Sequence, residues 1–505
     1  MHDNANAAFY FVDRHLSEGR ADKTAFVEGD RHLTYGTLAE QSDGMADLFA
    51  RRGLGPEDRA AMIVLDVIEF PLIFFGAMKA GVIPVAVNTL LTTEQYRYIL
   101  SDSRARAVFV SAPLLDMVRP ALKDLPHLRA VFVVGGSDPA GHDFAAELAA
   151  SARRPMIEAS ADETAFWLYS SGSTGMPKGV RHVHSAMPAT AETYGAQVLG
   201  IREDDTIFSA AKLFFAYGLG NGMSFPMSVG ATTVLLPTRP TPDAVFEIFR
   251  THQPTIYCGV PTLYAAMLAS AEDTLPGTDR LRISISAGEA LPAEIGERWQ
   301  ALTGTDILDG VGSTEMLHIF LSNAPGDVVY GTSGRAVPGY ELRLVDETGT
   351  AVPNDEVGEL LVNGATAADG YWNQRAKSRA TFEGVWTRTG DKYTRDADGR
   401  YTYCGRTDDM FKVSGQWVSP FEVEQALASH PHVLEAAVIP ALDEAGLEKP
   451  KAFVVPLDSA EIDTTALQDH VKAKVGPWKY PRWVDVVPDL PKTATGKIQR
   501  YKLRG

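Results

Sequence analysis

The chain has little cysteine and no excess of positive charge. Its only cysteines, Cys258 and Cys404, lie far apart in the sequence, which argues against a disulfide framework and against a zinc cluster. The formal net charge is −17, with 47 Lys and Arg residues against 64 Asp and Glu residues. A nucleic-acid-binding protein normally carries a basic excess or a basic stripe, so this class is disfavoured. We expect any nucleotide to be held at a local site.

The sequence also lacks an uninterrupted hydrophobic run of membrane-spanning length. The most apolar stretch, residues 70–87, contains Lys79, Gly81 and Pro84, which favours a buried helix followed by a buried strand. Residues 1–6 lack the basic start and the apolar core of a signal peptide. We therefore expect a cytoplasmic protein without a membrane partner.

Short apolar runs alternate with helix-length segments along the first two thirds of the chain. Residues 61–65, for example, precede a helix predicted over 70–79, and the apolar run 82–87 follows it. This alternation is typical of β-α units with parallel sheets, so we predict an α/β body. After about residue 330, Gly, Pro and Asp punctuate short strands such as 341–345, which predicts a β-rich region.

The last hundred residues differ from the body. Segment 418–429 predicts a helix, 433–439 a strand and 465–474 a second helix. A chain of 505 residues with 45% hydrophobic side chains is long enough for several cores. We predict two domains: residues 1–407 as the large α/β and β-rich body, and residues 408–505 as a small, mobile α+β domain.

One loop has the composition of a phosphate-binding site. It follows the strand-like run that ends at Tyr169 and reads SSGSTGMPKG over residues 170–179. Glycines let backbone N–H groups close on phosphate oxygens, hydroxyls donate further hydrogen bonds, and Lys178 adds positive charge. It is not a Walker A loop, because no Gly-Lys-Ser/Thr follows the first glycine at the required spacing. An ordinary Ser/Gly surface loop is the alternative, but three glycines, four hydroxyls and a lysine within ten residues favour the phosphate site.

This decapeptide resembles the signature of the adenylate-forming superfamily, which includes acyl-CoA synthetases, adenylation domains of peptide synthetases and luciferases. Four further motifs of that family occur in the family's order: DGVGSTE at 309–315, TGD at 389–391, GRTDD at 405–409 and PKTATGK at 491–497. The resemblance covers nearly the whole chain. It implies an ATP-dependent ligase that makes an acyl-adenylate and diphosphate, and then a CoA thioester and AMP.

The resemblance also implies roles for individual residues. Lys497 would reach the acid and the α-phosphate during adenylation, Glu315 would bind Mg²⁺, and Thr314 would contact the α-phosphate. Asp391 would accept hydrogen bonds from the ribose and Arg406 would donate to it. The full set implied for ATP or AMP comprises Ser170, Ser171, Gly172, Ser173, Thr174, Gly175, Lys178, Gly288, Glu289, Ala290, Asp309, Gly310, Val311, Gly312, Ser313, Thr314, Asp391, Arg406 and Lys497.

Some of these charged residues have a plainer interpretation. Lys497 lies in a basic tail, where a solvated lysine is the alternative, and Arg500 and Lys502 are interpreted as such solvated residues. His182 and His184 resemble a metal pair only superficially and are interpreted as loop histidines.

The acid would bind against KLFFAYGLGN at 212–221 and against the pair His318-Ile319, segments that resemble benzoate-CoA ligases in particular. An apolar slot with one or two polar tips suits a flat aromatic carboxylate. Core packing is the alternative for each aromatic ring taken singly. The expected acid is benzoate, with 4-hydroxybenzoate or 2-aminobenzoate as alternatives. The residues implied for its contact are Phe215, Ala216, Tyr217, Gly312, His318 and Ile319.

Only the second half-reaction needs the CoA thiol, so the C-terminal domain must withdraw Lys497. The resemblance places the hinge at Asp408 and a pantetheine tunnel along 412–417. The implied CoA contacts are Lys412, Ser414, Gly415 and Trp417. Many relatives carry Gly-Gly-Glu-Asn where this chain has Ser-Gly-Gln-Trp at 414–417, which leaves the role of Trp417 open.

Two rival functions are disfavoured. A stand-alone adenylation domain that loads a carrier protein would need an acidic side chain for an amino group, and residues 214–221 contain none. A non-catalytic nucleotide sensor would not need Lys497, Glu315 and Asp391 together. We expect ATP, Mg²⁺, CoA and a small aromatic carboxylate as ligands of a monomer or homodimer.

Overall fold

The structure of the protein is a computed structural model that describes residues 5–139, 141–170, 176–271, 274–407, 409–413, 416–444, 447–457, 460–476, 478–492 and 498–504. The chain forms two compact units. Unit 1 comprises residues 1–341 and 362–387, and unit 2 comprises residues 342–361 and 388–505. The domain boundary expected at 407/408 stays a prediction.

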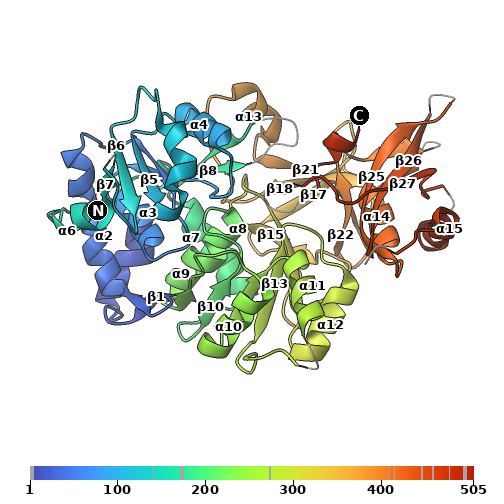
Figure 1. Ribbon diagram of the computed structural model, residues 1–505, viewed down its shortest axis with the longest axis horizontal. Helices are drawn as coiled ribbons and strands as arrows, with labels where there is room; N and C mark the ends of the chain where they lie inside the picture. The colour runs from blue at the N-terminus through green and yellow to red at the C-terminus, as the bar shows by residue number, and fades with distance from the viewer. Residues whose placement is uncertain are drawn as a thin grey trace. The chain divides into compact units, whose positions relative to one another are not determined.

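An eight-stranded sheet forms the first half of unit 1, in the blue to teal part of Figure 1. Its order is β19-β9-β8-β4-β3-β5-β6-β7, and the strands from β8 to β7 are all parallel. The pair β8-β9 and the pair β9-β19 are antiparallel. The strands are β3 (Arg59–Ile63), β4 (Ile83–Ala86), β5 (Ala107–Ser111), β6 (Ala130–Val134), β7 (His142–Asp143), β8 (Thr164–Ser170), β9 (Lys178–Val183) and β19 (Gly370–Tyr371).

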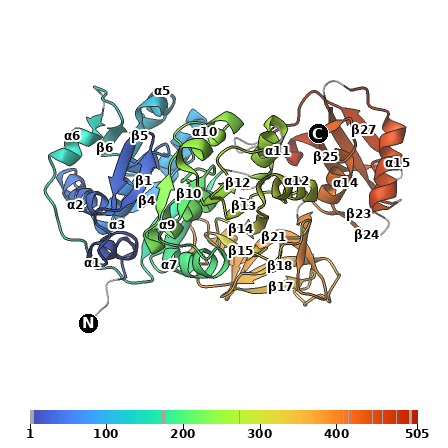
Figure 2. The ribbon, with the colours of Figure 1, turned by 90° about the horizontal axis from the view of Figure 1, so that it is seen from below.

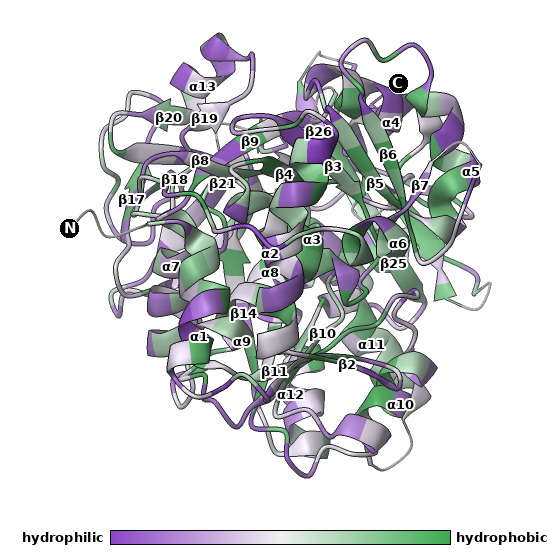
Figure 3. Cartoon of the chain, turned by 90° about the vertical axis from the view of Figure 1, so that its left-hand side faces the viewer, coloured by the Kyte–Doolittle hydropathy of each residue, from purple (hydrophilic) through white to green (hydrophobic). Residues whose placement is uncertain are grey.

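Helices cover both faces of this sheet, which explains why its strands are apolar on both sides (Figure 3). Within β5, Val108 and Val110 belong to the core cluster that contains α4, while Phe109 contacts Phe49 of α2 and Phe144 of α6. The segments around the sheet are η1 (Phe9–Asp13), α1 (Arg14–Ser17), α2 (Tyr35–Arg51), α3 (Glu69–Lys79), α4 (Thr93–Asp102), η2 (Ala112–Leu114), α5 (Leu115–Val118), η3 (Arg119–Leu122) and α6 (Phe144–Ala149). The buried helix and strand predicted over 70–87 are confirmed as α3 and β4.

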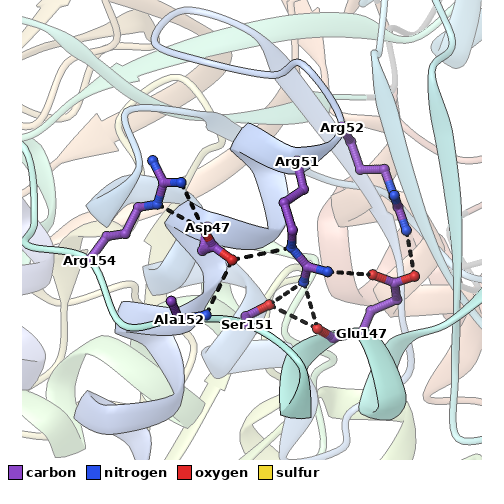
Figure 4. Close-up of polar contacts among 7 residues, drawn as sticks. All are labelled: Asp47, Arg51, Arg52, Glu147, Ser151, Ala152 and Arg154. Carbon is purple, nitrogen blue, oxygen red and sulfur yellow. Dashed lines mark hydrogen bonds and ion pairs between the residues drawn. The ribbon is translucent and has the colours of Figure 1, made fainter.

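A polar network fastens α2 to α6 and to the segment that follows it (Figure 4). Asp47 accepts hydrogen bonds from Arg154 at 2.7 and 2.9 Å, and Arg51 donates to the Glu147 carbonyl at 2.8 Å and to Ser151 Oγ at 2.6 Å. Side-chain pairs of this kind hold α2 and α6 in a fixed relation on the same side of the sheet.

A nine-stranded sheet forms the rest of the body of unit 1. Its order is β16-β15-β14-β13-β12-β10-β11-β1-β2, with parallel pairing from β14 to β1 and antiparallel pairing at both edges. The strands are β1 (Thr24–Glu28), β2 (Arg31–Thr34), β10 (Thr206–Ser209), β11 (Thr232–Val234), β12 (Ile256–Gly259), β13 (Ile283–Ala287), β14 (Ile307–Gly312), β15 (Ile319–Ser322) and β16 (Arg335–Ala336).

Three helices pack on one face of the second sheet, and Figure 2 shows α7 and α9 along the other. The core on the first face includes Phe249, Tyr257, Tyr264 and Trp299. The helices on the first face are α10 (Pro242–His252), α11 (Pro261–Ser270) and α12 (Ala293–Thr303). The other helical segments between β9 and β11 are α7 (Ala186–Thr190), η4 (Ala191–Val198), α8 (Ala216–Leu219), η5 (Gly220–Ser224) and α9 (Phe225–Val229). Later in the chain come α13 (Arg375–Thr381) and β20 (Phe382–Glu383). The predicted α/β class is confirmed.

Unit 2 contains the predicted β-rich region and the predicted C-terminal α+β region. Its elements are β17 (Glu341–Val345), β18 (Gly358–Asn363), β21 (Trp386–Arg395), β22 (Tyr401–Arg406), β23 (Phe411–Val413), β24 (Gln416–Val418), α14 (Pro420–Ala428), β25 (Val433–Leu442), β26 (Glu448–Pro456), α15 (Thr464–Val475), β27 (Trp483–Val486) and η7 (Arg500–Leu503). Val423 and Leu427 of α14 and Leu467 and Val471 of α15 share one core with β25 and β26. Across the described ranges, no helix combines the length and apolarity needed to cross a bilayer.

Candidate active site

The loop predicted to bind phosphate, called the phosphate loop below, connects two antiparallel strands of the first sheet. Ser170 ends β8, Lys178 begins β9, and these two residues are partners in the β8-β9 register. The pairing brings Ser170 and Lys178 to the same end of the hairpin. Ser171, Gly172, Ser173, Thr174 and Gly175 lie outside the described residues.

Glu315 lies beside the end of this hairpin at which the loop begins. Ser170 Oγ donates a hydrogen bond to Glu315 Oε1 at 3.2 Å, and Lys178 Nζ is 3.8 Å from the same oxygen. The hydroxyl of Tyr371 also donates to Oε1, at 2.9 Å. The structure thus brings together three residues expected from the sequence and adds Tyr371. Its Gly-Tyr-Trp context belongs to none of the five motifs and has no phosphate or metal chemistry that sequence reasoning could have used.

Glu315 alone supplies too few ligands for Mg²⁺, so a magnesium ion here would also need phosphate oxygens. Within the described residues, no group of three His, Cys, Asp or Glu side chains could hold a metal ion. Magnesium commonly keeps several waters and binds one or two carboxylates together with substrate phosphates. A single carboxylate, Glu315, beside the phosphate loop therefore suits a cation that arrives with ATP.

The motif at residues 309–315 begins in strand β14. Asp309 is buried, with 6% of its surface exposed, and its Oδ1 has no hydrogen-bond partner among the described residues. Burial raises the pKa of this carboxyl well above its usual range, against the opposing backbone N–H groups of Leu291 and Gly310. An added Cβ at Gly312 would lie 2.5 Å from the His318 carbonyl oxygen, so only glycine permits this close approach of β14 and β15.

The other residues implied for the nucleotide are also placed. Gly288, Glu289 and Ala290 follow β13, and Gly288 has a φ of +94°, a conformation that glycine adopts readily. Gly310 and Val311 lie within β14, while Ser313 and Thr314 follow it. Ser313 Oγ accepts a hydrogen bond from the Met316 N–H at 3.1 Å, which shapes the turn that holds Glu315.

The segment implied for the acid surrounds His318. Ala216 begins α8 directly after Phe215, and Gly220 begins the π-helical turn η5. The rings of Tyr217 and His318 are 5.9 Å apart, and His318 Nε2 is 3.3 Å from the Tyr217 carbonyl oxygen. An added Cβ at Gly220 would lie 2.3 Å from the His318 ring, so glycine makes room for the imidazole.

Burial determines the charge of His318. Its exposed fraction is 2%, and burial lowers its pKa to about 3, although the Tyr217 carbonyl opposes the shift. The imidazole is therefore neutral at physiological pH. Within the described part of the chain, His318 Nδ1 and Asn221 Oδ1 have no hydrogen-bond partner. Ile319 is also buried and pairs with Gly312 across β14 and β15.

One charged pair holds the start of the acid segment. Asp66, which is 3% exposed, accepts a hydrogen bond from the Leu213 N–H at 3.1 Å. Lys212 Nζ is 3.8 Å from the same carboxyl group and donates to the Leu236 and Thr238 carbonyls at 2.5 and 2.7 Å. Sequence reasoning did not single out Asp66, because an Asp after a strand is common and its partner lies 147 residues away.

In unit 2, the two residues implied for the ribose form a pair. Asp391 of β21 and Arg406 of β22 are register partners, and Arg406 Nη1 donates to Asp391 Oδ1 at 2.9 Å. Gly390, with a φ of +72°, lies against this guanidinium: an added Cβ would be 2.9 Å from Arg406 Nη2. The two charged groups therefore lie side by side on neighbouring strands of a β-hairpin.

The residues implied for CoA and for movement are only partly described. Lys412 and Trp417 are register partners on β23 and β24. Asp408, Ser414, Gly415 and Lys497 lie outside the described residues.

The loop interpretation is wrong for His182 and holds for His184. His182 lies within β9, is fully buried, and has a pKa lowered to about 3 by burial, whereas His184 lies in the turn that follows the strand and accepts a hydrogen bond from the Ala7 N–H at 3.0 Å. The interpretation of Arg500 as a solvated tail residue is also wrong, because Arg500 forms two hydrogen bonds to the Glu424 carboxylate at 2.8 and 2.6 Å.

Comparison with known families identifies the family to which a chain with these motifs belongs. Residues 13–372 match the AMP-binding enzyme family, and residues 422–497 match the AMP-binding enzyme C-terminal domain. The chain belongs to the AMP-binding enzyme family. The resemblance to adenylate-forming enzymes is therefore confirmed.

Within this family, the similarity to aryl acid ligases extends over the whole chain. The 4-hydroxybenzoate–CoA/benzoate–CoA ligase of Rhodopseudomonas palustris is 57% identical over 508 residues, covering 99% of this chain and 94% of that protein. The benzoate–CoA ligase of Thauera aromatica is 54% identical over 506 residues, with 99% and 95% covered. The crystal structure of a benzoate CoA ligase from Burkholderia xenovorans LB400 superposes with a TM-score of 0.90 at 49% identity, covering 99% of both chains.

Proposed function

We propose that this protein is an ATP-dependent benzoate–CoA ligase. It joins benzoate to CoA through a benzoyl-adenylate, with release of diphosphate and AMP. The observation that carries the proposal is the similarity along 99% of the chain to two benzoate-CoA ligases, at 57% and 54% identity. A protein that keeps all five adenylation motifs in order at this level of identity is expected to keep the acid–thiol ligase reaction.

Adenylation brings a carboxylate and ATP together, so positive charge must offset their repulsion. Lys178 beside the phosphate loop and Lys497 at the acid would supply it. Mg²⁺ bound to Glu315 and to phosphate oxygens would neutralise further negative charge. Asp391 and Arg406, already paired at 2.9 Å, would bind the ribose hydroxyls.

The residues implied for the acid suit a neutral ring with a single carboxylate. Because His318 is uncharged and lies among aromatic rings, it offers no attraction for a carboxylate at that end of the pocket. The carboxylate of benzoate would therefore be directed toward Lys497. Phe215, Ala216 and Tyr217 would contact the ring, together with Gly312 and Ile319.

A second candidate substrate is 4-hydroxybenzoate. The relative at 57% identity is named for both acids. In addition, two buried acceptor atoms near Tyr217 lack hydrogen-bond partners among the described residues: Asn221 Oδ1, and His318 Nδ1 in the neutral ring whose Nε2–H donates to the Tyr217 carbonyl. A ring hydroxyl can donate one hydrogen bond, so it could satisfy either atom.

The test is a substrate panel scored by AMP release with ATP, Mg²⁺ and CoA present. Benzoate is expected to give the highest kcat/KM, with 4-hydroxybenzoate next, 2-aminobenzoate weaker and hexanoate far below the three aromatic acids. Hexanoate as the best substrate would contradict the proposal. Diphosphate release without any benzoyl-CoA would instead favour an adenylation domain that loads a carrier protein, and absence of turnover would favour a nucleotide sensor. The cytoplasmic location and the monomeric or homodimeric state stay predictions from the sequence.

A further inference from the structure

Tyr371 lies between the two charged groups that would bind the phosphates and Mg²⁺. Its phenol oxygen is 2.9 Å from Glu315 Oε1 and 3.2 Å from Lys178 Nζ. The direct separation of Lys178 Nζ and Glu315 Oε1 is 3.8 Å, which is longer than a hydrogen bond. The phenol therefore bridges an ammonium and a carboxylate that do not hydrogen-bond each other.

The direction of the two hydrogen bonds follows from which of the three groups can donate a proton. An ammonium can only donate and a carboxylate can only accept, so the phenol accepts from Lys178 and gives its one proton to Glu315. Thr381 Oγ1, at 3.4 Å, is a longer and neutral alternative acceptor. Donation to the carboxylate is favoured because hydrogen bonds to charged groups are the stronger ones.

Backbone hydrogen bonds fix Tyr371 to both of its partners' segments. The segment 368–372 pairs with β9, which begins at Lys178, and the Trp372 N–H donates to the Gly179 carbonyl at 2.8 Å. At its other end, the Ala368 N–H donates to the Glu315 carbonyl at 2.8 Å. The phenol is thus carried by a segment anchored to the phosphate-loop strand and to the turn that holds the carboxylate. Only 5% of Tyr371 is exposed, so its position is set by packing.

The two oxygens of Glu315 are used differently. Ser170 and Tyr371 both donate to Oε1, whereas no hydrogen bond to Oε2 is found among the described residues. Oε2 can therefore accept a cation. Lys178 and Glu315 Oε1 already form an ion pair at 3.8 Å. Without the phenol, the ammonium could close to hydrogen-bonding distance, and that contact would compete with phosphate for Lys178 and with the metal for Glu315.

We propose that Tyr371 is a positioning residue of the adenylation half-reaction. Its hydroxyl keeps Lys178 and Glu315 from hydrogen-bonding each other, so that the ammonium would stay available to phosphate and the carboxylate, through Oε2, to Mg²⁺. The inference rests on the proposed function, since it needs ATP as the ligand of this loop.

The test compares Tyr371→Phe with the matched variant Tyr340→Phe. Phenylalanine keeps the ring that contacts Phe382 and lies 4.2 Å from Lys178 Nζ, and removes only the bridging oxygen. Tyr340 is also a buried tyrosine of unit 1, and its hydroxyl is hydrogen-bonded to Thr366 Oγ1 at 3.0 Å instead. Loss of the same kind of atom at Tyr340 therefore reports the general effect of removing a buried, hydrogen-bonded tyrosine hydroxyl from unit 1.

Calorimetry of ATP binding provides a readout that does not depend on turnover. Tyr371→Phe is expected to weaken binding of ATP with Mg²⁺ about tenfold, and to change binding of ATP in EDTA much less. The Mg²⁺ concentration that half-saturates benzoate-dependent ATP–diphosphate exchange should rise by about the same factor. Conversion of supplied benzoyl-AMP and CoA to benzoyl-CoA should stay within about twofold of wild type, because that step does not use ATP.

Three results would overturn the inference: wild-type affinity for ATP with Mg²⁺, equal weakening with and without Mg²⁺, or the same losses in Tyr340→Phe. Because the calorimetric measurement of ATP binding needs no aromatic acid, its result does not depend on whether the proposed function is correct. A wild-type enzyme that binds ATP with Mg²⁺ but activates no aromatic acid would refute the function and leave the role of Tyr371 decided by the titrations.

Discussion

Asp66 and Leu213 connect the first sheet to the acid segment through one hydrogen bond of 3.1 Å, from the Leu213 N–H to Asp66 Oδ1. The carboxyl follows β3 of the first sheet, and Leu213 precedes α8. Burial raises the pKa of Asp66 to about 6, against the attraction of Lys212 and the hydrogen bond from Leu213. A buried charge thus helps to place the residues that would contact benzoate.

The raised pKa gives a pH dependence of stability with a definite sign. The folded protein binds the Asp66 proton more tightly than the unfolded chain, so this group costs stability as pH rises from about 4 to about 6, by about 3 kcal/mol in all. Asp66→Asn removes the titration. The melting temperature of Asp66→Asn, minus that of wild type, should therefore increase from pH 4 to pH 7. The matched change Asp116→Asn, at a fully exposed carboxyl, should give a flat difference. Parallel curves for Asp66→Asn and wild type would show that Asp66 is not the titrating group.

A second prediction separates the half-reactions. If Lys497 stabilises charge only while the adenylate forms, Lys497→Ala should lose adenylation on the order of a hundredfold or more. The variant should still convert supplied benzoyl-AMP and CoA to benzoyl-CoA at a rate within about twofold of wild type. Stopped-flow or quenched assays of each step would measure both. Equal loss of the two steps would place Lys497 outside the adenylation chemistry.

A third prediction concerns the space beside His318. In Gly220→Ala, the added Cβ would lie 2.3 Å from the imidazole, so His318 must shift. Overpacking of this kind is expected to lower kcat/KM for benzoate about tenfold, with the KM for ATP unchanged. Gly55→Ala is the matched control, because an added Cβ at Gly55 meets no atom within 4 Å. Unchanged kinetics in Gly220→Ala would mean that the position of His318 does not affect the acid.

The sequence predicted the parts of the site that recur as contiguous motifs. The β-α alternation, the loop that follows the strand ending at Tyr169, and the choice of Ser170, Lys178 and Glu315 as site residues were expected, because each depends on local pattern. The hairpin that pairs Ser170 with Lys178 was not predicted. Lys79 shows what local pattern cannot predict. The sequence shows only that a lysine interrupts an apolar run, whereas its burial, at 1% exposure, depends on ion pairs with Asp13 and Asp43 at 2.6 and 2.8 Å. Asp66 and Tyr371 were missed for the same reason, since their partners are distant in sequence and only the fold brings them together.

The last prediction concerns the size of the acid. Ala216 is the smallest side chain in the bulky run from Phe214 to Tyr217, and it begins α8 in a half-exposed position. If it forms a wall of a short aryl slot, Ala216→Leu should reduce kcat/KM for benzoate about tenfold and for 4-hydroxybenzoate more, because a fitted apolar pocket discriminates by about 1–3 kcal/mol per methylene. Ala244→Leu, at a half-exposed position in the first turn of α10, is the matched control and should leave every acid unchanged. Hexanoate is the internal comparison, since a flexible chain can bend away from an added side chain while a rigid ring cannot. The ratio of benzoate to hexanoate should therefore fall in Ala216→Leu and stay constant in Ala244→Leu. If Ala216→Leu leaves every ring unaffected, the aryl slot is formed by other residues.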